Sequence, residues 1–160
     1  MNHVAIVEIL TVGQLAVATV VLAVVLAAVA WTDGHSLRIP DMLSIPLILG
    51  GIGLSFVLPD LGVLHHVAGA VGGYLLFSLF GELHFRQRGF EGLGLGDAKL
   101  FAAAGAWLGW QLLPLVLLAA SIGGICWAVV LSRHREVAFG PWLAAAFFLA
   151  WSIQVLLVRS

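Results

Sequence analysis

Residues 92–110 read GLGLGDAKLFAAAGAWLGW, a glycine-rich stretch that leads into a long apolar run. Asp97 and Lys99 are the charged residues of this segment, and they stand where the apolar residues begin. The apolar run predicts a helix that starts close to Asp97. A carboxylate at the start of a helix can be a cap, because the helix dipole favours an anion there, or it can belong to a functional site.

The whole chain has the composition of a membrane protein. Hydrophobic residues make up 62% of its 160 positions and charged residues 9%, and the mean hydropathy is +1.12. Soluble domains carry about 25% charged residues, so this chain is predicted to lie in a lipid bilayer. Its length suits one compact bundle, and we expect a single membrane-embedded domain over residues 1–160.

Apolar stretches of membrane-spanning character recur along the chain. A spanning helix needs about 20 apolar residues. Six stretches qualify or come close, at 6–31, 41–58, 62–83, 98–110, 112–131 and 140–158. They predict an all-α, polytopic bundle of about six transmembrane helices. The second and fourth are short, which implies local thinning of the bilayer or burial among neighbouring helices.

Basic residues indicate the orientation of the bundle. If six helices alternate, the loops near 32–40, 84–97 and 132–139 share one side. Together with Lys99, just beyond the second loop, they account for six of the seven basic residues, whereas Arg159 lies on the other side. The positive-inside rule places these loops in the cytoplasm and both termini on the external side of the membrane. Asp33 and Asp97 then face the same compartment.

Two carboxylates at one membrane boundary suit peptide hydrolysis. Like charges a few ångströms apart do not both ionise easily, so one pKa rises and the pair shares a proton near neutral pH. The ionised carboxylate takes a proton from water, and the protonated one donates to the peptide carbonyl. We therefore consider Asp33 and Asp97 as a candidate catalytic pair.

Other chemistries have little support in the sequence. Cys126 is the single cysteine and lies in an apolar run, where we interpret it as a buried, inert thiol. Neither a HExxH pattern nor a phosphate-binding GxxxxGK[ST] loop is present. We expect no metal site, no cofactor and no nucleic-acid partner.

Three alternatives remain open at this point. Boundary aspartates often cap helices, and Asp41, directly after Pro40, fits that role. A proton-coupled transporter component would also carry titratable groups, although such sites usually lie near the bilayer midplane between repeated halves, and no repeat is visible here. An inactive scaffold paralogue is the third alternative, against which the intact Asp33 and Asp97 argue.

Three stretches resemble the motifs of the type IV prepilin peptidases, bacterial members of the GxGD aspartyl proteases. DGHSLRIPD at 33–41 resembles the first motif, GLGD at 94–97 followed by AKL resembles the second, and FGPWLA at 139–144 resembles the start of the last helix. The resemblance implies that Asp33 and Asp97 are catalytic and that Asp41 merely starts a helix.

The resemblance also implies a substrate. Members of this family remove a short basic leader, ending in glycine, from type IV prepilins or pseudopilins at the cytoplasmic face of the bacterial inner membrane. The mature segment of the substrate begins with a long apolar helix. Gly94 and Gly96 lack a Cβ, so they permit unusual dihedral angles and let a substrate backbone approach Asp97. Lys99 either reaches the membrane interface or stabilises ionised Asp97.

One feature of larger family members is missing. Many carry a cytoplasmic insert with paired CxxC motifs that bind zinc and support methylation of the new N-terminus. This chain resembles a short form without that insert, because it has one cysteine. Methyltransferase activity is therefore not expected, nor are zinc or S-adenosylmethionine.

Overall fold

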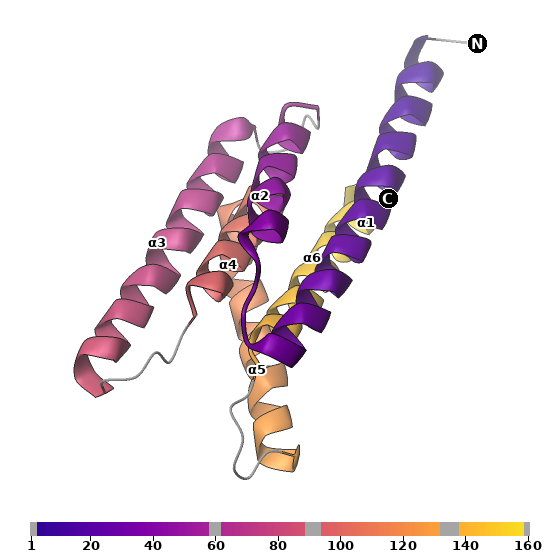
Figure 1. The fold of residues 1–160 in the computed structure, drawn as a ribbon. Coiled ribbons are helices and arrows are strands. Elements are labelled where there is room, and N and C mark those ends of the chain that lie inside the picture. The colour runs from indigo at the N-terminus through magenta and orange to yellow at the C-terminus, as the bar shows by residue number, and fades with distance from the viewer. Residues whose placement is uncertain (1–2, 58–61, 89–93, 132–137, 159–160) are drawn as a thin grey trace.

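A computed structural model describes residues 3–57, 62–88, 94–131 and 138–158. This part of the chain is helical and contains no strand, which confirms the predicted all-α class. The elements are α1 (His3–Ser36), α2 (Asp41–Ser55), α3 (Val63–Arg88), α4 (Leu95–Leu108), the short 3-10 helix η1 (Trp110–Leu112), α5 (Leu113–Leu131) and α6 (Gly140–Val158) (Figure 1).

The helices alternate in direction. In Figure 1, α1, α3 and α5 run towards the lower end of the bundle, whereas α2, α4 and α6 run away from it. The last turn of α1 and the first turn of α4 therefore lie towards the same end. These two turns carry Asp33 and Asp97.

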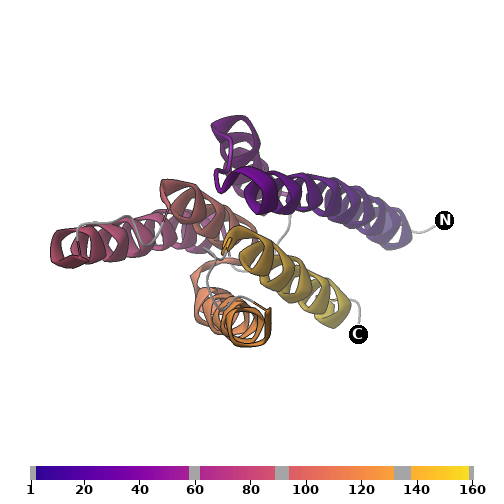
Figure 2. The ribbon, with the colours of Figure 1, turned by 60° about the horizontal axis from the view of Figure 1, so that its bottom comes forward.

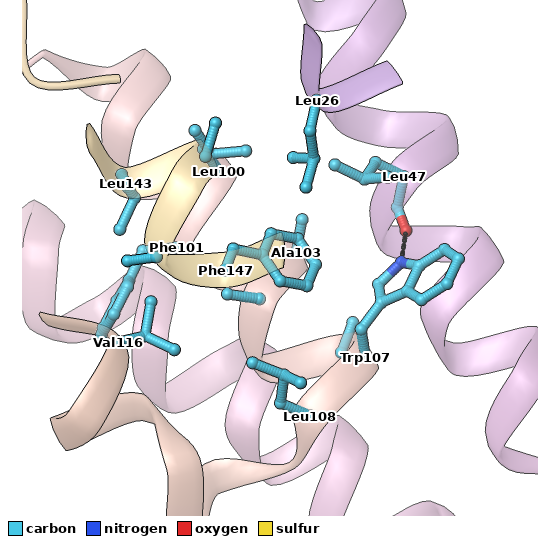
Figure 3. Packing of buried hydrophobic residues seen from close by; sticks show 14 of the residues in the cluster. Leu26, Leu47, Leu100, Phe101, Ala103, Trp107, Leu108, Val116, Leu143 and Phe147 are labelled. Carbon is cyan, nitrogen blue, oxygen red and sulfur yellow. Dashed lines mark hydrogen bonds between the residues drawn. The ribbon is translucent and has the colours of Figure 1, made fainter. Parts of the chain in front are cut away.

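The short helix α4 forms the centre of the bundle. Residues 100–108 are all buried, because α2, α3 and α6 pack around them. Figure 3 shows Phe101, Trp107 and Leu108 of α4 among side chains from the other helices, and the Trp107 indole N–H donates to the Leu47 carbonyl at 2.8 Å. Protein rather than lipid surrounds this helix, so its length need not match the bilayer, as the sequence led us to expect for the fourth stretch.

Four of the described helices are long and apolar enough to cross a membrane, through residues 13–36, 63–83, 110–130 and 140–157. The first helix continues beyond its predicted end at Trp31 to Ser36. The next residue, Leu37, has its backbone in the left-handed region (φ 52°), and its N–H donates to the Asp33 carbonyl at 2.9 Å. Asp33 thus lies on the helix itself and not in the following loop.

Two glycines bring α3 and α4 into backbone contact. A Cβ at Gly69 would lie 2.6 Å from the Gly105 carbonyl oxygen, and one at Gly105 would overlap the Gly69 carbonyl. Close approach of this kind stabilises helix pairs in lipid, where hydrophobic drive between helices is weak. The α3–α4 contact therefore holds the central helix in place.

This contact leads to a stability prediction. Gly69→Ala should lower the melting temperature of the purified protein in detergent, because overpacking costs about 1–3 kcal/mol. Gly72→Ala on the same helix is the control. Its Cβ would meet nothing within 4 Å, so the alanine should be neutral or stabilise the helix by up to about 1 kcal/mol. Equal melting temperatures for the two variants would contradict the contact.

The position predicted for Cys126 is wrong. Its side chain is exposed on α5 instead of buried. Helix α5 is apolar on all sides, so its sequence carries no periodic pattern that distinguishes a lipid-facing position from a packed one.

Candidate active site

Asp33 connects α1 to the start of α6. Its side chain is only 6% exposed, and its Oδ2 atom accepts the backbone N–H of Gly140 at 3.0 Å. Gly140 is the first residue of α6, where backbone N–H groups have no partner within the helix. A Cβ at Gly140 would lie 2.5 Å from Asp33 Oδ2, so only glycine fits beside the carboxylate without displacing it.

Asp97 lies in the first turn of α4 and is largely buried. Its Oδ1 atom is buried and has no hydrogen-bond partner among the described residues, which is uncommon for a polar atom. The pKa of Asp97 is raised from 3.8 to about 7, first by burial and then by the negative charge of Asp33, while a backbone hydrogen bond with Gly94 opposes the rise. The carboxyl group therefore exchanges its proton near neutral pH.

The structure brings Asp33 and Asp97 together from residues that are far apart in the sequence. Their proximity is evident in the effect of the Asp33 charge on the pKa of Asp97. Two carboxyl groups that share one proton can offer one ionised and one protonated group to a reacting molecule. Within the described ranges, no three His, Cys, Asp or Glu residues form a group suited to a metal ion.

The two glycines before Asp97 differ in their surroundings. Gly94 has ordinary extended dihedral angles (φ −70°, ψ 143°) and does not use the conformational freedom that glycine permits. A Cβ at Gly96 would lie 3.0 Å from Ile39 Cβ, which means that Gly96 lets the start of α4 pack against the segment before α2. Among the described residues, the atom nearest to a Cβ at Gly94 would be Asp97 Oδ2 at 3.8 Å. Approach of a substrate over Gly94 stays a prediction.

Lys99 pairs with Asp41. Its Nζ atom lies 2.5 Å from Asp41 Oδ1, with the lysine side chain 26% and the aspartate side chain 59% exposed. Lys99 is not among the causes of the Asp97 pKa shift, so the predicted tuning of Asp97 has no support here. The ion pair joins the first residue of α2 to α4. Asp41 is not the expected cap either, because Pro40 holds the N-cap position.

Gly140 lies within the FGPWLA stretch, but the sequence indicated no role for it at the site. FGPW at 139–142 matches a family pattern at a helix start, and a glycine in the first turn is the signal that could have indicated a close neighbour. Its contact with Asp33 depends on the packing of α1 against α6, which is a tertiary feature.

The titration of Asp97 can be measured directly. The infrared band of its protonated carboxyl group should disappear as the pH rises through about 7. In Asp33→Asn the midpoint should move to lower pH, because the charge of Asp33 is gone, yet stay above 3.8, because the group is still buried. Asp97→Asn should lack the band. A midpoint near 4 in the unsubstituted protein would contradict the described site.

The fold and the site define a polytopic helical membrane protein with two carboxyl groups, those of Asp33 and Asp97, that interact electrostatically at one end of its bundle. Residues 20–129 match the sequence model of the type IV leader peptidase family, and the chain belongs to that family.

Several curated relatives carry the name prepilin leader peptidase/N-methyltransferase. The protein from Aeromonas salmonicida (strain A449) is 39% identical over 148 residues, which cover 88% of this chain and 50% of the relative. The protein from Escherichia coli (strain K12) is 43% identical over 130 residues, covering 74% and 57%. The protein from Pseudomonas aeruginosa is 39% identical over 144 residues, covering 81% and 48%.

The chain spans about half the length of these curated relatives. No solved structure matches it. The family membership favours a peptidase over the transporter component that the sequence left open.

Proposed function

We propose that this protein is an aspartic endopeptidase that removes the leader from type IV prepilins or pseudopilins, with Asp33 and Asp97 as its catalytic pair. The observation that carries the proposal is the buried Asp97 carboxyl group, whose pKa is raised to about 7 beside Asp33. The family and the names of the relatives support the choice of substrate.

The first step of the proposed reaction is the addition of water to the peptide carbonyl. Asp33 is assigned as the base, because its Oδ2 atom accepts a hydrogen bond from the Gly140 N–H, which favours the ionised carboxylate. It takes one proton from water as the water oxygen bonds to the carbonyl carbon. Asp97 is the acid and gives its proton to the carbonyl oxygen, which leaves a neutral gem-diol.

The second step breaks the peptide bond. Asp33 returns its proton to the amide nitrogen, and the carbon–nitrogen bond cleaves to release the amine of the mature chain. One hydroxyl of the gem-diol gives its proton to Asp97, and the leader leaves as a carboxylic acid. Both carboxyl groups are back in their starting states, and no metal or covalent intermediate enters the reaction.

The proposed reaction takes place at the cytoplasmic face. The two helices that carry the pair each have a basic residue near it: Arg38 follows α1, and Lys99 lies in α4. An excess of basic residues on one side of a membrane protein favours the cytoplasm for that side. We propose no methyl transfer for these 160 residues, because a single cysteine does not form the paired CxxC motifs of that activity.

The test is co-expression with a prepilin that carries a basic leader ending in glycine. Intact mass spectrometry of the membrane fraction should show loss of exactly the leader. A prepilin with a bulky residue in place of that glycine is the matched control substrate and should stay uncleaved. A glycine-containing prepilin that stays intact beside correctly inserted protein would overturn the proposal.

A further inference from the structure

An open groove of about 630 Å³ lies between α1 and α2, away from the carboxylate pair. The groove is lined by the Gly13–Val21 face of α1, by Gly50, Gly53 and Leu54 of α2, by Val57 just after α2 and by Trp107 of α4. Helix α1 packs mainly against α6 and makes few contacts with α2. Helices α1 and α2 diverge towards the end of the bundle that carries the N-terminus (Figures 1 and 2). The groove is therefore open from the side, where a membrane would surround the bundle.

The lining is apolar, and its glycines leave room for an occupant. A Cβ at Gly13 or at Gly53 would meet nothing within 4 Å. Val17 is 65% exposed although it lines the groove. In lipid, small residues let a second helix approach a helical backbone closely, so this lining suits a helix better than bulky side chains would.

The distance from the groove to the candidate site can be expressed as a number of residues in a substrate helix. A helix rises about 1.5 Å per residue, so Val21 lies about 18 Å and Gly13 about 30 Å along α1 from Asp33. A substrate helix that starts at the carboxylate pair and runs beside α1 would bring roughly its residues 12–20 into the groove.

We propose that this groove receives the apolar helix of the substrate, with the peptide bond to be cleaved at Asp33 and Asp97. This inference rests on the proposed function, which supplies a substrate whose mature part begins with such a helix. The bound helix fills the groove between α1 and α2. Its position along α1 then determines which peptide bond lies at Asp33 and Asp97.

Cysteine cross-linking tests the register. In a Cys126→Ser, Asp97→Asn background, Val17→Cys should form a disulfide with a cysteine near position 16 of the mature segment, and not with one near position 4. Ile122→Cys is the matched control, because it is also lipid-facing but lies on α5. Equal cross-linking of both substrate positions, or of Ile122→Cys, would show random collision in the bilayer and overturn the register.

Filling the groove tests its use in cleavage. Gly53→Leu should raise KM for a full-length prepilin by about tenfold, since a clash of the substrate helix with the leucine costs about 1.4 kcal/mol. The kcat should change little, and a peptide that ends eight residues after the scissile bond should be cleaved as before. Gly72→Leu is the matched control, because Gly72 is also exposed with nothing within 4 Å of its Cβ.

The outcomes separate the two proposals. An unchanged KM for Gly53→Leu, in protein that cleaves the prepilin, would overturn the docking site and leave the proposed function intact. A second copy of the chain or a lipid in the groove would give this result. If the unsubstituted protein cleaves neither substrate, the proposed function fails, and the docking site fails with it.

Discussion

Asp97→Asn and Asp33→Asn are each expected to slow prepilin cleavage by about 10²–10⁴-fold, the usual contribution of a general acid or base. The amide keeps the size of the carboxyl group but neither accepts nor donates the proton that the reaction needs. The double variant should be about as slow as either single variant, because the two groups act as a unit. Single-turnover cleavage, followed by mass spectrometry of the released leader, measures the rates.

Asp41→Asn is the matched control. Asp41 is an aspartate at the start of a helix near the same end of the bundle, but its side chain is 59% exposed and pairs with Lys99. An exposed ion pair contributes at most about 1 kcal/mol to stability, so cleavage should continue. Wild-type rates in Asp97→Asn or Asp33→Asn would refute the pair. Loss of cleavage in Asp41→Asn alone would mean that Asp41, and not Asp33, is the partner of Asp97.

Gly140→Ala should lower the rate of cleavage by about a hundredfold without unfolding the protein. The new Cβ would lie 2.5 Å from Asp33 Oδ2, so the carboxylate must shift and its hydrogen bond with the Gly140 N–H is disturbed. A misplacement of about 1 Å in a reacting group costs roughly 10²-fold in rate. The expected change is in kcat, since the groove proposed for substrate binding is remote from Gly140.

Gly34→Ala provides the control for this second experiment. Gly34 follows Asp33 directly, yet a Cβ there would meet nothing within 4 Å. Cleavage should therefore stay near the wild-type rate. Size-exclusion profiles and melting temperatures of both variants show whether the fold is retained. A folded Gly140→Ala protein with full activity would mean that the position of Asp33 does not limit the reaction.

Much of the fold could be predicted from the sequence, because lipid imposes simple rules on it. The lengths of the apolar stretches located the six helices α1–α6. The short stretch after Asp97 indicated a helix that is buried among others, and α4 is such a helix. The end of α1 was placed too early, at Trp31. The residues TDGHS that follow are polar, and polarity marks the end of an apolar run but not the end of a helix that extends beyond it.

The site was predictable only where a motif pointed to it. Asp33 and Asp97 stand out because carboxylates are rare in so apolar a chain, and the structure brings them together. The contacts of Gly140 with Asp33, Gly96 with Ile39 and Lys99 with Asp41 depend on how separate helices pack. No local spacing encodes such contacts, which is why the ion pair of Lys99 with Asp41 was not predicted from the sequence.

The burial of α4 has a consequence for how the protein responds to its membrane. Helices in contact with lipid tilt or shift when acyl chains lengthen or shorten, whereas α4 is held by Gly69 of α3 and by the carbonyl of Leu47 in α2. Asp97 therefore keeps its place relative to protein and not relative to lipid headgroups. Its proton affinity should be the same in thin and thick bilayers, so a cell that remodels its fatty acids with temperature would leave this carboxyl group unaffected.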